Sequence, residues 1–146
     1  HSFARAVFDH DRGKPDEVIR AVGRDGFVGV VLVPFFLTGD PHPTLDDFVR
    51  HVAHIAEQIG ADHVGVGTDW AGPYLPVLAA KIDAEMAGRG FRPEHNMKHD
   101  MTVDGYDAWT DWPNLTCALL RYGFTEREVR GMIGENFLRT FKQVVG

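Results

Sequence analysis

Two short apolar runs lie on either side of one long amphipathic pattern, and this arrangement constrains the fold most. The runs are rich in valine and glycine and cover residues 27–33 and 63–69. Neither run alternates between apolar and polar side chains, which indicates strands buried on both faces, as in parallel sheets. Between them, apolar residues recur at three- and four-residue steps over 45–59, which predicts a helix with one buried face. The pattern therefore predicts a parallel strand–helix–strand unit of an α/β protein.

Capping signals place the helices. Pro15 with two acidic residues after it predicts a helix start, and Gly26 predicts its end. Thr44 is expected to cap the helix over 45–59, and Thr125 is expected to open a capping box. Further helices are expected over 73–88, over 113–122 and, interrupted by Gly134, over the C-terminal residues. The expected inner faces consist of Leu75, Leu78, Ala79, Ile82 and Met86 in the first of these, Cys117 in the second, and Phe137, Leu138, Phe141 and Val144 in the last.

Two strands are too few for an independent sheet. Parallel strands buried on both faces need neighbours, and two-stranded sheets are not stable alone. The chain also begins at His1 rather than at methionine. We therefore expect further strands from an upstream part of the same protein, or from another chain.

Composition excludes several classes of partner. The formal net charge is −6 and no basic cluster is present, which argues against nucleic acid and anionic membranes as partners. No apolar run approaches the ~20 residues of a membrane span. The one cysteine, Cys117, excludes an intrachain disulfide, and no secretory leader is visible. A cytoplasmic location is expected.

Asp69 is the strongest catalytic candidate that the residues themselves suggest. It ends the second predicted strand, and in α/β sheets and barrels the carboxyl ends of strands carry the chemistry. The alternative is a residue that only caps the following loop. A terminal histidine such as His1 would by itself be read as disordered.

The other histidines suggest structural roles. His51 and His54 lie three residues apart on the central predicted helix, and we expect packing and hydrogen bonding rather than metal binding. His95 and His99 lie in the long polar segment 89–112, where an exposed lid is favoured over a second metal site.

Several motifs, in this order and spacing, resemble the membrane (renal-type) dipeptidase family of zinc metallopeptidases. The resemblance covers nearly the whole chain apart from about residues 71–108. It is carried by HSFARAVFDHDR at 1–12, PDE at 15–17, HVAHI at 51–55, Gly60, DHVGVGTD at 62–69, WPNLT at 112–116, ALL at 118–120, GENFLR at 134–139 and Phe141.

The resemblance implies a fold and a site. The fold would be a (β/α)8 barrel, of which residues 1–146 form the C-terminal part of a single domain, with 71–110 as a variable insertion near the mouth. Two zinc ions would activate water for hydrolysis of a dipeptide or similar small amide. By the resemblance, His1 is a metal ligand, Arg12 binds the substrate's terminal carboxylate, and Asp69 moves the proton to the leaving amine. The remaining ligands would lie upstream, so this chain alone is expected to be inactive. A homodimer stays an open alternative.

Two departures from the family pattern leave other functions open. The chain has Asp69-Trp-Ala-Gly72 where relatives often have Asp-Phe-Asp-Gly, so a second acid is missing, and 73–108 is longer than usual. A non-catalytic barrel that binds a ligand or partner is one alternative. Another metal-dependent hydrolase, such as a lactonase or deacetylase, is a second, because Ile133-Gly-Glu-Asn136 resembles the end of several such barrels.

Overall fold

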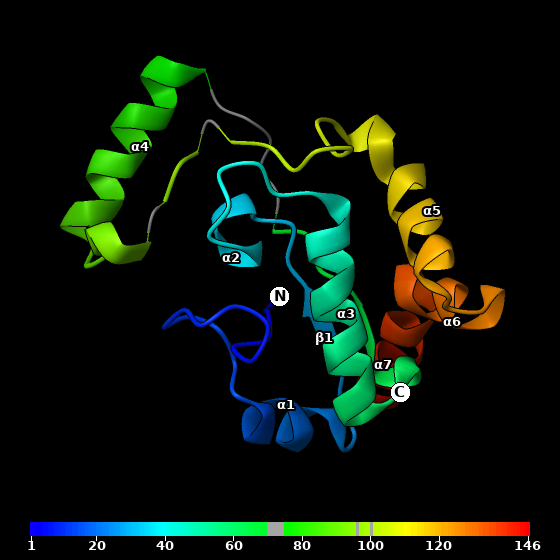
Figure 1. The fold of residues 1–146 in the computed structure, drawn as a ribbon. Coiled ribbons are helices and arrows are strands. Elements are labelled where there is room, and N and C mark those ends of the chain that lie inside the picture. The colour runs from blue at the N-terminus through cyan, green and yellow to red at the C-terminus, as the bar shows by residue number, and fades with distance from the viewer. Residues whose placement is uncertain (70–74, 96, 100) are drawn as a thin grey trace.

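The computed structural model describes residues 1–69, 75–95, 97–99 and 101–146. Figure 1 shows the elements in the order α1 (Asp16–Gly23), β1 (Val28–Val30), α2 (Pro34–Leu37), α3 (Leu45–Ile59), β2 (Val64–Val66), α4 (Pro76–Gly88), α5 (Trp112–Tyr122), α6 (Glu126–Arg130) and α7 (Asn136–Val145). The shorter elements are the 3-10 turns η1 (Ala61–His63), η2 (Pro93–His95) and η3 (Trp109–Asp111), and the π-helical turn η4 (Gly131–Glu135).

The sheet is parallel, as the sequence predicts. Val28 to Val30 lie opposite Val64 to Val66, and all three residues of β1 are buried. On its other edge β1 forms a parallel bridge between Val30 and Ser2. The Ser2 N–H donates to the Gly29 carbonyl over 2.8 Å, and the Val31 N–H donates to the Ser2 carbonyl over 2.9 Å. The N-terminal segment therefore lies beside β1, with β2 on the opposite edge. Both strands are shorter than the predicted runs.

Helix α3 packs beside the sheet and between α1 and α5 (Figure 1). Its predicted cap is confirmed: Thr44 Oγ1 accepts from the Asp47 N–H over 3.4 Å, and the Thr44 N–H donates to Asp47 Oδ2 over 2.7 Å. Together these bonds satisfy backbone donors that a helix start leaves unpaired. The predicted apolar face is buried and includes Phe48, Val49, Val52 and Ile55.

The C-terminal elements attach to the start of β2. Gly134 interrupts the helical path, as predicted, with an extended φ of 172° inside η4. Asn136 is buried, and its Nδ2 donates to the carbonyls of Ala61 (2.8 Å) and Val64 (2.9 Å). Its Oδ1 accepts from Arg139 over 3.1 Å. This one amide side chain therefore joins α7 to the segment that enters β2.

Three packing predictions are wrong for the described chain. Cys117 is exposed rather than buried. Helix α4 begins at Pro76; of its predicted inner face Leu75 and Leu78 are exposed, whereas Ala79 is buried and Ile82 and Met86 are half-buried. The part of the predicted helix at 73–74 lies outside the described residues.

The predicted inner face of α7 is also exposed. Phe137 contacts Phe27, with 5.9 Å between ring centroids, yet its exposed fraction is 52%. Leu138, Phe141 and Val144 are exposed as well. The physical reason is that the described residues form no layer over this face.

Candidate active site at the carboxyl end of the strands

Asp69 and His1, both predicted from the sequence as site residues, lie close together. The sheet continues past β2, since the Leu32 N–H donates to the Thr68 carbonyl over 2.8 Å, and Asp69 follows directly. His1 precedes the segment that pairs with the other edge of β1. The two side chains are 3.3 Å apart, measured from His1 Nε2 to Asp69 Oδ2, and both are about half exposed. Parallel pairing thus brings an imidazole and a carboxylate to one place.

The backbone of Asp69 is unusual. Its φ is 49°, in the left-handed region that residues other than glycine seldom adopt. Aspartate tolerates this conformation better than most residues, and such positions are concentrated at functional sites. The local geometry therefore fits a residue placed for chemistry.

Arg12 and Asp69 both line a cavity of about 270 Å³. The guanidinium carbon of Arg12 lies 5.0 Å from the ring centroid of Phe91 and 5.5 Å from that of Phe36. In the described parts of the chain it forms no ion pair. A stacked guanidinium with unused donors can bind a carboxylate through two parallel hydrogen bonds.

His10 supports the loop that carries Arg12. The Arg12 N–H donates to His10 Nδ1 over 3.1 Å, and the His10 ring packs 5.2 Å from the ring of His95. Burial lowers the pKa of His10 below its ordinary value. A neutral imidazole keeps Nδ1 available as an acceptor, which stabilises this turn at neutral pH.

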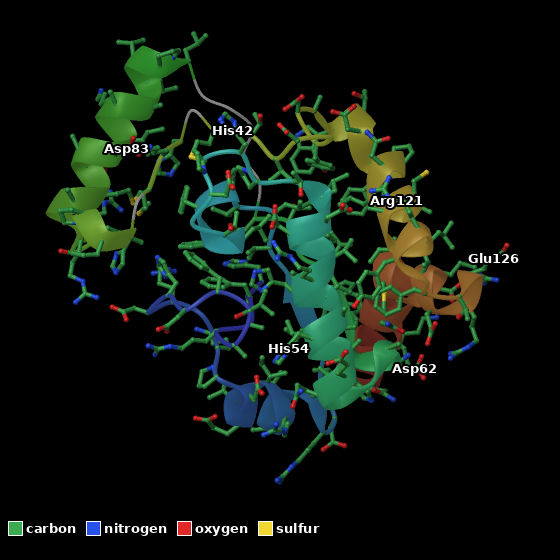
Figure 2. All side chains as sticks on the ribbon, viewed as in Figure 1. His42, His54, Asp62, Asp83, Arg121 and Glu126 are labelled. Atoms are coloured by element: carbon green, nitrogen blue, oxygen red, sulfur yellow. The ribbon has the colours of Figure 1, made fainter. Side chains whose placement is uncertain are left out.

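The histidines of α3 have structural partners, as expected. His51 is fully buried, and its ring nitrogens bond the Leu37 carbonyl and the Ala4 N–H. His54 Nε2 lies 2.8 Å from Asp16 Oδ1, so it connects α3 to α1; Figure 2 shows it between the two helices.

The histidines of the long polar segment are less exposed than the lid prediction requires. His95 is buried, and its Nδ1 accepts from the Arg92 N–H over 3.1 Å. His99 Nδ1 lies 2.5 Å from Asp83 Oδ1 on α4, and its ring contacts that of Phe35. An exposed lid is therefore wrong for His95.

The donor chemistry at His1 suits a metal ion only in part. Imidazole nitrogen is a common ligand of zinc, and a carboxylate lies beside it. Within the described ranges, however, no group of three or more His, Cys, Asp or Glu side chains could hold a metal ion. His1 fits as one ligand of a set that these residues do not complete.

Sequence reasoning missed the apolar wall of the cavity. Phe91, Met97 and Met101 line it together with Ile82 and Met86 of α4. The available signal was the presence of large apolar residues inside an otherwise polar segment. The prediction about Trp70 to Gly72 lies outside the described residues.

The fold and this site define an α/β protein with its polar groups at the carboxyl ends of parallel strands. A sequence model of the membrane dipeptidase family, peptidase family M19, matches residues 1–80, which include His1, Arg12 and Asp69. The chain therefore belongs to the membrane dipeptidase family.

Individual relatives agree with this assignment. Dipeptidase verJ from Clonostachys rogersoniana is 30% identical over 146 residues, which are 99% of this chain and 30% of that protein. An amidohydrolase structure from Pseudomonas aeruginosa matches with a TM-score of 0.82 and 29% identity, over 99% of this chain and 44% of that one. A metallopeptidase from Rhodobacter sphaeroides, solved with a phosphinate mimic of the dipeptide L-Ala-D-Ala, matches with a TM-score of 0.73 and 22% identity, over 97% and 34%.

The chain therefore spans less than half the length of these relatives, and its fold is part of a larger one. None of the helices in the described ranges combines the length and the apolar character that crossing a membrane requires.

Proposed function

We propose that the complete protein is a zinc-dependent dipeptidase built on a (β/α)8 barrel, with residues 1–146 as the C-terminal part of that single domain. The observation that carries the proposal is the approach of His1 to Asp69 beside the cavity that Arg12 also lines. Membership of the membrane dipeptidase family supports the reaction class. The missing strands, the remaining metal ligands and a cytoplasmic location belong to the same proposal.

Each of the three residues has a distinct role in this proposal. His1 holds a metal ion through an imidazole nitrogen. When bound, a pair of zinc ions would lower the pKa of the attacking water and polarise the peptide carbonyl. Arg12 binds the terminal carboxylate of the substrate, since a guanidinium is permanently charged and matches a carboxylate in shape. Asp69 accepts a proton from the attacking water and delivers it to the leaving amine.

The segment 71–110 is proposed as the variable insertion at the barrel mouth. Several of its described residues, among them Ile82, Phe91 and Met101, contribute to the cavity that Asp69 and Arg12 line. A small substrate fits this arrangement, because Arg12 and Asp69 line one cavity of only about 270 Å³.

The test uses the complete protein as purified. We expect about two zinc ions per chain and hydrolysis of small dipeptides that chelation abolishes and added zinc restores. Asp69→Asn should lower kcat by roughly 10²–10⁴-fold while zinc content stays unchanged. Arg12→Ala should mainly raise KM, and His1→Ala should lower zinc content.

The matched control is Asp62→Asn, because Asp62 is an exposed carboxylate in an ion pair with Arg127 and lies outside the cavity. It should keep wild-type kinetics. Absence of both metal and hydrolysis would instead favour a non-catalytic member of the family. Wild-type turnover by Asp69→Asn would refute the proton-transfer role alone.

A further inference from the structure

We propose that the cavity beside Arg12 and Asp69 binds the side chain of the substrate's C-terminal residue and selects large apolar side chains there. This inference rests on the proposed function. It assigns a specificity pocket to side chains that the reaction itself does not require.

The chemistry of a dipeptide indicates which of its two residues places its side chain in the cavity. The leaving amine nitrogen and the terminal carboxylate both belong to the C-terminal residue of the dipeptide. Asp69 serves the nitrogen and Arg12 the carboxylate, and both residues line the same cavity. The side chain that branches from the carbon between these two groups therefore enters that cavity.

Most of the side chains that line the cavity are apolar; besides Arg12 and Asp69, the polar ones are Lys98 and His99. Phe35 and Phe36 line one side. Large apolar residues from α4 and the segment after it line the other: Ile82, Met86, Phe91, Met97 and Met101. Methionine side chains are flexible and polarisable, so they can adapt to aliphatic and aromatic groups alike. The volume of about 270 Å³ is slightly below the roughly 300–1,000 Å³ of whole ligand pockets, which suits part of a dipeptide.

Polar and ring contacts hold this second wall together and attach it to the rest of the chain. Asp83 of α4, labelled in Figure 2, lies 2.5 Å from His99, and the ring of His99 contacts that of Phe35 in α2. Arg92 forms an ion pair with Asp11, next to Arg12. The wall lies beyond residues 1–80, where the family model matches. Its selectivity is therefore a property of this chain's own residues rather than of the matched part of the family.

The experiment measures kcat/KM of the complete, metal-loaded protein for L-Ala-X dipeptides with X as Gly, Asp, Leu, Met or Phe. We expect values at least about tenfold higher for Leu, Met and Phe than for Gly, because one methylene in an apolar pocket changes specificity by roughly 10–200-fold. Asp at X should be a poorer substrate than Leu, because its carboxylate would lose water against a mostly apolar lining in which Lys98 is the one cation besides Arg12.

Variants of α4 test the wall directly. Ile82→Asp should lower kcat/KM for Ala-Phe by at least about tenfold and leave Ala-Gly within about twofold, because only the larger side chain reaches the wall. Val77→Asp is the matched control, since Val77 is on the same helix but is 80% exposed and lies outside the cavity. If Ile82→Asp does not fold, Ile82→Phe provides the test. It narrows the pocket without adding charge, and it should lower kcat/KM for Ala-Phe but not for Ala-Gly.

The remaining outcomes separate this inference from the proposed function. Equal kcat/KM for Gly and Phe at X, or selection at the N-terminal residue instead, would overturn the pocket and leave the dipeptidase standing. An equal loss for Ala-Gly and Ala-Phe in the folded variant would mean a structural role only. No hydrolysis of any dipeptide would overturn both.

Discussion

His51 shows how one buried residue joins segments that are distant in the sequence. It is fully buried on α3. Its Nε2–H donates to the Leu37 carbonyl over 2.9 Å, and its Nδ1 accepts from the Ala4 N–H over 3.2 Å. A carbonyl can only accept and an N–H can only donate, so the neutral Nε2–H tautomer is required. Burial lowers the pKa of His51 to about 4.

This pKa predicts a loss of stability in acid. Between pH 6.5 and about 4 the unfolded chain binds a proton at His51 while the folded chain does not, so the free energy of unfolding falls as the pH falls. The full loss is about 3 kcal/mol, since one pKa unit corresponds to about 1.4 kcal/mol. Urea unfolding of the complete protein, followed from about pH 7.5 to about pH 4, measures it.

His51→Gln should unfold with a weaker pH dependence than wild type over this range. His42→Gln is the control: it removes an exposed histidine whose ring has no hydrogen bond or ion pair among the described residues, and it should keep the wild-type slope. Where His51→Gln is too unstable to compare, NMR titration of the His51 ring in the wild-type protein gives the answer. A ring that titrates near pH 6.5 would contradict the prediction.

At the residue scale the sequence predicted Asp69 on physical grounds, because the strand before it is recognisable from its own residues. His1 and Arg12 could be assigned only through the family resemblance. Their neighbours in space, Asp69 and Phe36, are far from them in the chain, and no local pattern encodes such contacts. Their roles stay predictions until kinetics are measured.

At the scale of elements, the contact between β2 and η4 requires a glycine. A Cβ atom at Gly65 would lie 2.4 Å from the Met132 carbonyl oxygen, and this neighbour is backbone. Asn136 holds the same region through its bonds to Ala61 and Val64. The turn before α7 therefore packs directly against the strand.

Gly65→Ala should destabilise the complete protein by about 1–3 kcal/mol, because overpacking forces the backbone to shift. Urea unfolding measures the change. Gly88→Ala is the control, since an added Cβ there meets nothing within 4 Å. It should leave stability unchanged or raise it by up to about 1 kcal/mol, as alanine restricts the unfolded chain. Wild-type stability of Gly65→Ala would show that η4 can move away.

The elements with strong local signals were predictable, and those that depend on partners were not. Thr44 caps α3 and Thr125 forms a capping box, both as expected, and Gly134 interrupts the last helix. The predicted inner face of α7 remains exposed, and that of α4 is exposed at Leu75 and Leu78. Periodicity identifies an apolar face, but it does not reveal whether the layer that covers the face comes from the same 146 residues.

At the scale of the whole molecule, the chain has apolar surfaces that its described residues leave open. Phe137, Leu138 and Phe141 of α7 are each about half exposed, and Val144 is 80% exposed. Contiguous exposed apolar surface of this kind marks an interface. The chain covers 44% and 34% of the two similar structures described above and 30% of dipeptidase verJ, so we expect the rest of the larger fold to cover this face.

Residues 1–146 expressed alone should therefore be inactive and should not melt cooperatively. The physical reason is that a sheet of two short strands and one bridged segment cannot bury enough apolar surface to offset the conformational entropy lost on folding. Circular dichroism during heating should show a broad, sloping change, and a dye specific for exposed apolar surface should bind strongly. The complete protein, measured in parallel, should melt sharply and bind little dye. A sharp melt of the isolated chain would mean that the face of α7 is covered in another way, for which self-association measured by sedimentation is the direct test.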